Sequence, residues 1–194
     1  MTMRIPAYAA FFLLFLAGCQ TPPPQTAFPE ITFGHETPIT FMVSSISVDS
    51  QYRSPMQAPN VEHLAPVPSE RALRRWAADR LRSSGAPGQG RFVILDASIR
   101  ESRLPVTEGL RGTFTKDQSS RFDATMEASL ELVDERGLRR GFANARVMRS
   151  QTIREDATLV DRDKMLFGLV DDLMKDFNRE MERNIRQYLV GFML

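Results

Sequence analysis

Residues 121–132 alternate strictly between polar and apolar side chains, and this pattern constrains the fold more than any other segment of the chain. The apolar members are Phe122, Ala124, Met126, Ala128, Leu130 and Leu132. Because successive side chains of a β-strand point to opposite faces, the pattern predicts a half-buried strand of an antiparallel sheet. The polar members, among them Asp123, Glu127 and Glu131, are then expected on a solvated face. Carboxylates on such a face keep ordinary pKa values, so we expect no acid–base catalysis from them.

Three further strands are predicted at residues 39–48, 92–103 and 141–147. The first shifts its apolar phase by one residue, as a β-bulge would cause. The last has small residues on its inward side, which indicates close approach by a helix. A tight turn at 135–137 joins it to the alternating strand.

Two helices complete the predicted domain. Ser69 is the expected N-cap of the first, and Gly85 its expected C-terminal stop. The second runs from about Leu159 to Leu189, where apolar residues recur every three or four positions. We therefore predict an α+β fold in which a four-stranded, mainly antiparallel sheet carries both helices on one face of a two-layer sandwich. The predicted element order is β-α-β-β-β-α.

The first nineteen residues have the layout of a secretory signal. Arg4 precedes an apolar run at 11–16, and the small residues Ala17 and Gly18 follow. The run is too short to span a bilayer, which needs roughly 20 residues. Beyond Cys19, the prolines at 22–24 predict an extended tether, because proline suits neither a helix interior nor a central strand.

The segment Leu16-Ala17-Gly18-Cys19 resembles a bacterial lipobox. The resemblance implies cleavage before Cys19 and acylation of its sulfur and of the new amine, and several acyl chains anchor a protein stably. The chain then divides into a signal peptide (1–18), a lipidated Pro-rich tether (19–37) and a periplasmic domain (38–194). Because Gln20 is not Asp, the resemblance implies the outer membrane, with the inner membrane as the alternative. An ordinary signal peptide would instead leave a soluble periplasmic protein.

Composition excludes several classes of function. The net charge of +1 argues against a general nucleic-acid binder. Cys19 is the only cysteine, so once it is lipidated no thiol remains for a disulfide, a zinc site or a nucleophile. His35 and His63 both lie in loop-like sequence, where we expect solvated side chains rather than a metal site. We therefore expect no catalytic residues, no cofactor and no enzyme.

Two regions are candidate binding sites. A Pro-rich segment at 52–68 predicts an exposed loop, and residues 103–118 predict a hairpin tip. From these, Tyr52, Arg53 and Phe114 are expected to protrude as contact residues. The first helix is basic, and Arg71, Arg74 and Arg75 on it are suited to gripping phosphate groups. The alternative is that these arginines simply lie on a solvated helix face and bind nothing.

The order of elements, together with the lipobox and tether, resembles small envelope lipoproteins such as the lipopolysaccharide-assembly lipoprotein and transport-auxiliary lipoproteins. The resemblance implies a non-enzymatic accessory of an envelope protein complex, acting in envelope assembly or lipid transport. The alternative is direct binding of anionic lipid or lipopolysaccharide through the basic helix.

Overall fold

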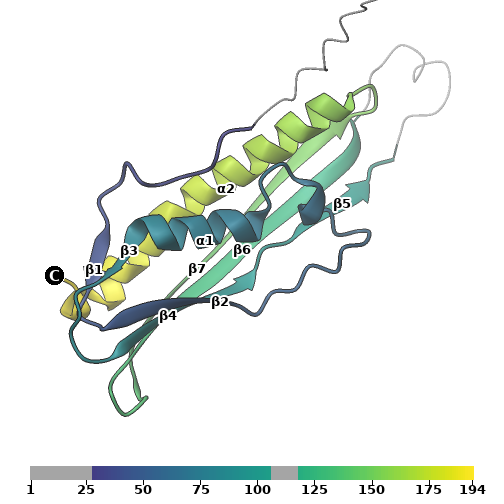
Figure 1. The fold of residues 1–194 in the computed structure, drawn as a ribbon. Helices are drawn as coiled ribbons and strands as arrows, with labels where there is room; N and C mark the ends of the chain where they lie inside the picture. The colour runs from purple at the N-terminus through teal and green to yellow at the C-terminus, as the bar shows by residue number, and fades with distance from the viewer. Residues whose placement is uncertain (1–27, 106–117) are drawn as a thin grey trace, which may run out of the picture.

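The computed structural model describes residues 28–105 and 118–194, and a long β-hairpin forms its centre (Figure 1). The two strands are β6 (Gln118–Val133) and β7 (Arg139–Arg154), each of 16 residues. They pair antiparallel along their length, and Gly137 takes the left-handed conformation (φ 75°) that the turn between them needs. The predicted alternation is confirmed, because every apolar member from Phe122 to Leu132 is buried.

The other strands flank this hairpin. β4 (Gln89–Asp96) and β5 (Ile99–Arg103) pair antiparallel with successive halves of β6. β2 (Ser45–Ser50) adds to β4 in parallel, which gives a five-stranded mixed sheet. A separate parallel pair is formed by β1 (Ile39–Phe41) and β3 (Leu81–Ser83).

Two predicted strands are therefore divided. The strand expected at 39–48 breaks between Phe41 and Ser45, so the shift of apolar phase marks a change of sheet and not a bulge. The strand expected at 92–103 breaks after Asp96, whose carboxylate accepts a hydrogen bond from the Ser98 amide (2.9 Å). That local turn moves the chain from one half of β6 to the other. The four-stranded prediction is wrong in number, and the two parallel pairs were not expected.

Both helices lie on the same face of the large sheet, as predicted (Figure 1). They are α1 (Ser69–Arg80) and α2 (Leu159–Tyr188). Helix α1 differs at both ends from the expectation: Pro68 occupies the N-cap, and the helix stops before Gly85 because Leu81 enters β3. Helix α2 begins with a capping box between Thr158 and Asp161, which the sequence analysis did not identify.

The core lies between the helices and the sheet, with Trp76 of α1 at its centre. The indole packs edge-on against Phe177 of α2 (5.2 Å between centroids), and its plane is tilted by 33° to the ring of Phe92 of β4 (5.5 Å). Its N–H donates to Asn178 Oδ1 (2.8 Å), so the one polar group of this ring is satisfied. Sheet and both helices thus meet at one side chain.

Helix α2 approaches β7 closely at Gly141, as the small residues of that strand predicted. A Cβ atom at Gly141 would lie 2.5 Å from Leu189 Cδ2 and 3.1 Å from a ring atom of Phe192. Both neighbours belong to the end of α2 and the 3-10 turn that follows it, η2 (Val190–Phe192). In the described ranges, neither helix has the length and apolarity needed to cross a bilayer.

Packing also includes two segments expected to be exposed. Ile31 and Phe33 lie before Pro38, yet both are buried in the core. The expected loop at 52–68 carries a short 3-10 helix, η1 (Glu62–Leu64), and it buries Val61, Ala65 and Val67. The apolar residues between its prolines hold it against the domain, so the prediction of a fully exposed loop is wrong.

Candidate functional site

Residues 28–37, here called the strap, run over the two helices and contain a turn at 34–36. Its attachment to α1 is centred on Asp79. The Asp79 Oδ2 atom accepts hydrogen bonds from Thr32 Oγ1 (2.6 Å) and from the Phe33 amide (2.8 Å). The strap is therefore bound to α1 by specific polar contacts as well as by its buried apolar side chains.

Both ends of the strap are held too. At its start, the ring of Phe28 packs on Phe167 of α2 (5.1 Å between centroids). At its end, the carbonyl of Thr37 accepts a hydrogen bond from Arg80, which is 1% exposed and pairs with Glu182 of α2 (2.7 Å). The ion pair with Glu182 and the contact with the Thr37 carbonyl compensate the burial of the Arg80 charge.

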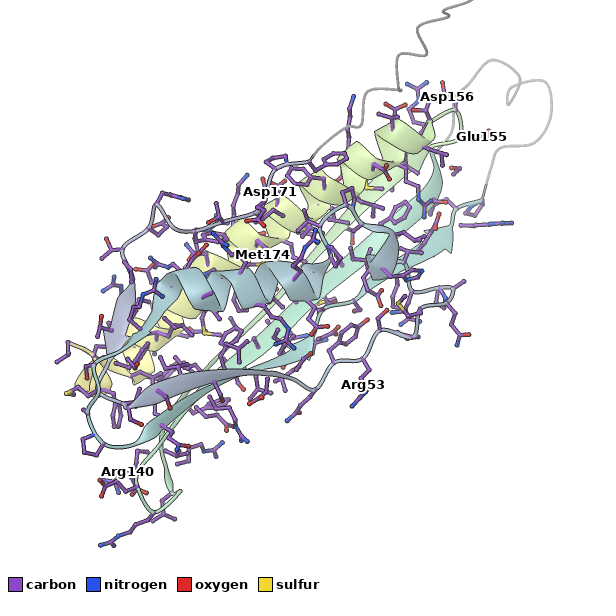
Figure 2. The ribbon with its side chains drawn as sticks, viewed as in Figure 1. Arg53, Arg140, Glu155, Asp156, Asp171 and Met174 are labelled. Carbon is purple, nitrogen blue, oxygen red and sulfur yellow. The ribbon has the colours of Figure 1, made fainter. Side chains whose placement is uncertain are left out.

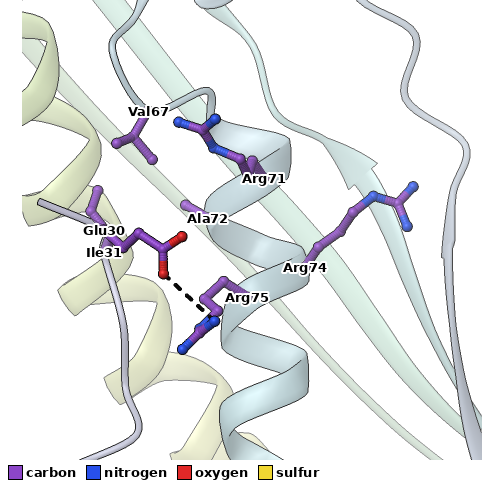
Figure 3. Close-up of a pocket in the computed structure, with 7 residues that line it drawn as sticks. All are labelled: Glu30, Ile31, Val67, Arg71, Ala72, Arg74 and Arg75. Carbon is purple, nitrogen blue, oxygen red and sulfur yellow. Dashed lines mark ion pairs between the residues drawn. The ribbon is translucent and has the colours of Figure 1, made fainter. Parts of the chain in front are cut away.

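A groove of about 280 Å³ opens between the strap and the first turns of α1 (Figure 3). Its apolar lining comes from Ile31, Val67 and Ala72. Its polar rim comes from Glu30 and from arginines of α1. Ligand pockets span roughly 300–1,000 Å³, so this groove is suited to one chain or ring rather than to a whole lipid.

Arg71 and Arg75 stand on the groove side of α1 (Figure 3). Arg75 is paired twice, with Asp79 (Nε–Oδ1 3.1 Å) and with Glu30 of the strap (3.6 Å). Arg71 donates to the Pro66 carbonyl (2.9 Å), and within the described residues it forms no ion pair with a carboxylate. A guanidinium has five N–H donors, so Arg71 keeps donors for an anionic group.

Arg74 also lines the groove, but its guanidinium does not lie beside theirs. Its guanidinium extends from the other side of α1 (Figure 3), where it bonds Glu70 Oε1 (2.9 Å) and the Val48 carbonyl of β2 (3.2 Å). With Arg80 neutralised by Glu182, most of the positive charge of this helix is paired. The three predicted arginines are exposed. Of the three, Arg71 alone keeps free donors at the rim of the groove, so together they do not make a broad basic patch.

Asp79 controls this side of the groove electrostatically. Burial raises the pKa of its carboxyl, but the hydrogen bonds from Thr32 and Phe33 and the charge of Arg75 outweigh that effect. The net result is a pKa below the usual range. Asp79 is therefore negative at neutral pH and holds both the strap and Arg75.

Tyr52 is not a protruding contact residue. Its hydroxyl donates to Glu62 Oε1 (2.6 Å), and Ser54 donates to the same oxygen. Burial, and then the bond to Glu62, raises the pKa of Tyr52. Burial also acts to raise the pKa of Glu62, but bonds from Ser54, Tyr52 and the Ile99 amide lower it below its usual value. This network joins the loop to β5, which is why Tyr52 points inward.

The structure describes only some of the remaining predicted site residues. Arg53 is exposed and extends away from the sheet (Figure 2). Cys19 and Phe114 lie outside the described residues. His35 stacks on Phe33, while His63 lies in η1.

The acidic outer face of the sheet is engaged in ion pairs. Hydrogen bonds from Ser150 and from Arg121 hold the pKa of Asp123 below its usual range, so it is a poor general acid. Glu131 accepts a hydrogen bond from Arg91 (2.7 Å). Over residues 28–105 and 118–194, no group of three or more His, Cys, Asp or Glu residues is placed to hold a metal ion.

Several residues that line the groove were not predicted as site residues from the sequence. Glu30 and Ile31 were assigned to the tether, and Val67 to an exposed loop. The signal that could have found them is short: Ile31 and Phe33 are two residues apart, as in an extended segment with one buried side.

No family model and no curated protein matches this chain. Among solved structures, it is similar to a minor lipoprotein from Acinetobacter baumannii (12% identity, TM-score 0.38, 73% of this chain and 94% of that one). It is also similar to the rare lipoprotein B of Shewanella oneidensis (10%, TM-score 0.36, 72% and 92%). A third is a DUF330 protein from Xanthomonas campestris (11%, TM-score 0.35, 87% and 90%). At these identities and TM-scores, the similarity carries no functional assignment.

Proposed function

We propose that this chain is a non-enzymatic lipoprotein of the bacterial envelope, anchored through lipid on Cys19 at the periplasmic face of the outer membrane. The lipobox-like segment and the Pro-rich tether support the anchor. Mass spectrometry of the native protein tests it. The expected species begins at Cys19 and carries acyl groups on its sulfur and amine, whereas an unmodified thiol or a retained signal segment contradicts the proposal.

The groove supports binding of an amphiphile that has one apolar chain and one anionic group. The observation that carries this proposal is that Arg71 keeps free donors at the rim of an apolar groove. The neighbouring Arg75 is already paired with Asp79 and Glu30. An anionic headgroup would accept hydrogen bonds from Arg71, and its chain would lie against Ile31 and Val67. Such a ligand is a single-chain anionic lipid, such as a lysolipid, from the adjoining membrane.

Titration with lysophosphatidylglycerol below its micellar concentration tests the groove. A charge-assisted hydrogen bond contributes about 1.5–3 kcal/mol, so Arg71→Gln is expected to weaken binding by about tenfold or more. Arg91→Gln is the control of equal charge change, because Arg91 is exposed, pairs with Glu131 (2.7 Å) and does not line the groove. Equal loss in both variants, or none in Arg71→Gln, refutes the assignment.

The second proposal is an accessory role in an envelope protein complex for assembly or lipid transport. Exposed apolar side chains at the far end of α2 favour it. Extraction of the intact protein in mild detergent should recover a stable envelope partner. Recovery of this chain alone would contradict the accessory role.

A further inference from the structure

The first turn of α2 exposes two neighbouring apolar side chains. Leu159 is 82% exposed and Val160 is 46% exposed. The capping box of Thr158 and Asp161 already satisfies this helix end, and it requires no leucine or valine at the two positions between them. Single exposed apolar residues are ordinary on a surface, so the pair gains meaning only from its place in the molecule.

The pair stands at one end of the domain and points outward from it. Because the Cα–Cβ bonds of a helix tilt toward its N-terminus, side chains in the first turn lean past the helix end. Figure 2 shows Glu155 and Asp156 at this end, and Arg140 at the opposite end of the molecule. The backbone of the turn is fixed, since the Asp161 amide donates to Thr158 Oγ1 (3.2 Å).

The strap starts close to the same end. Phe28, at its start, packs on Phe167 in the first half of α2. Thr37, at its end, lies beside the ion pair between Arg80 and Glu182 in the last turns of α2. The strap therefore runs along α2 toward the helix C-terminus, and Phe28 is its residue nearest the exposed pair.

An anchor at Cys19 brings this end of the domain to the bilayer. Leu159 lies eight residues before Phe167, or about 12 Å along α2 at 1.5 Å per residue. Phe28 follows Cys19 by nine residues, which span at most about 30 Å. Tyr188 lies 21 residues beyond Phe167, or about 32 Å in the other direction. That far end would meet the bilayer only with the connecting residues fully stretched back along α2.

The charges beside the pair do not attract it to an anionic surface. Residues 154–164 hold three basic and four acidic side chains. Arg154 pairs with Asp156 (3.2 Å), and Arg162 pairs with Glu101 of β5 (2.7 Å). A contact made here is therefore apolar and does not depend on anionic lipid.

We propose that Leu159 and Val160 insert into the surface of the anchoring bilayer and hold this end of the domain against it. The inference rests on the lipid anchor proposed above and adds a second contact that orients the anchored domain. Because a short tether keeps the pair at a high effective concentration beside the bilayer, two apolar side chains suffice for an anchored domain. Ile31 of the groove, three residues after Phe28, then lies in the half of the domain nearer the lipid.

Fluorescence quenching in the intact, lipidated protein tests the contact. Cys19 is the only cysteine and is acylated in this protein as proposed, so one introduced cysteine carries the probe. The probe is placed at Glu155→Cys, beside the pair, or at Arg140→Cys, at the opposite end (Figure 2). In phosphatidylcholine vesicles with nitroxide-labelled headgroups, the Glu155→Cys probe should lose most of its fluorescence and the Arg140→Cys probe should lose none.

Two double variants isolate the apolar pair. Burying one large apolar side chain shifts an equilibrium by about tenfold or more, so Leu159→Ser with Val160→Ser should lower the ratio of docked to undocked domain at least about tenfold. Leu138→Ser with Val190→Ser is the matched control, because it removes an exposed leucine and an exposed valine from the opposite end. It should leave the quenching of the Glu155→Cys probe unchanged. Both double variants should keep the melting temperature of the unsubstituted protein.

The remaining outcomes decide between occupants of the pair. Equal loss in both double variants, no loss in the first, or quenching abolished at about 1 M salt, where charges are screened, overturns the proposal. Quenching that disappears when each vesicle holds one copy would show a second copy on the pair, and it also overturns the proposal.

Mass spectrometry separates failure of the contact from failure of the anchor. If Cys19 is acylated and the protein floats with the vesicles while the Glu155→Cys probe stays bright, the contact is wrong and the anchor stands. If the sulfur of Cys19 is unmodified in the native protein, both fail.

Discussion

Replacing Asp79 with alanine removes the side chain that fixes the strap to α1. Two strap donors, Thr32 Oγ1 and the Phe33 amide, bond its carboxylate. Burial of Ile31 and Phe33 contributes about 1.5–3 kcal/mol per side chain. The two hydrogen bonds to Asp79 add to this burial and fix the position of the strap on α1.

The magnitude follows from those two bonds. A hydrogen bond to a charged group contributes about 1.5–3 kcal/mol, so the lower bound for the pair is about 3 kcal/mol. At 1.4 kcal/mol per tenfold, the equilibrium for strap opening should rise about a hundredfold. The Glu36 amide, which donates to the Phe33 carbonyl (2.9 Å), reports on this opening.

Hydrogen exchange measures the effect directly. In Asp79→Ala, protection of the Glu36 amide should fall about a hundredfold while amides of β6 keep theirs. Asp172→Ala is the control, because that carboxylate is exposed and pairs with Arg149 of β7 (3.5 Å) rather than with the strap. A change at Glu36 of less than threefold, or loss of protection across β6, would refute the reasoning.

The same contacts make the strap sensitive to acid. The pKa of Asp79 is lower in the folded protein than in the unfolded chain, so folding favours the carboxylate. Its stabilisation is complete above the unfolded value, about 3.9, and is lost as the pH falls through the lower folded value. Glu36 protection, corrected for intrinsic exchange, should be constant from pH 7 to 5 and fall below about pH 4. Asp79→Asn should abolish this dependence, and a persistent pH effect in that variant would exclude Asp79 as its origin.

Three substitutions test the packing of the two helices, each by a denaturant titration followed through tryptophan fluorescence. Gly141→Ala should destabilise the fold by about 1–3 kcal/mol, because the new methyl group would meet Leu189. Asn178→Ala should cost about 2 kcal/mol by leaving the indole N–H of Trp76 unpaired in the core. Thr158→Ala removes the N-cap of α2 and should cost about 1 kcal/mol. A free energy of unfolding that matches the unsubstituted protein would contradict the corresponding contact.

The sequence predicted best the elements whose pattern is long and local. Strand β6 and helix α2 each repeat their period many times, so errors at single positions do not change the assignment. The close contact at Gly141 was also readable, because small inward residues in a strand leave space that a neighbouring helix fills. The split between β4 and β5 was not, since it depends on a turn at Asp96 and on which half of β6 each strand meets.

The candidate site was only partly predictable for a related reason. The spacing of Arg71 and Arg75 places them on one side of a helix, but nothing local says that the strap lies against that side. Arg74 carries the same chemistry and faces β2 instead. Tyr52 is turned inward by Glu62, ten residues away, and the pairing of two such polar residues in a Pro-rich segment has no periodic signature.

The strap has a consequence for the order in which the domain assembles during synthesis. Its binding surface requires both α1 and α2, and α2 ends only at Tyr188, whereas the strap itself is complete by residue 37. The strap is synthesised before the rest of the domain, but it cannot dock until nearly the whole chain has been made. Until α2 is complete, residues 28–37 lack part of their binding surface, so closure of the strap is a late step of folding.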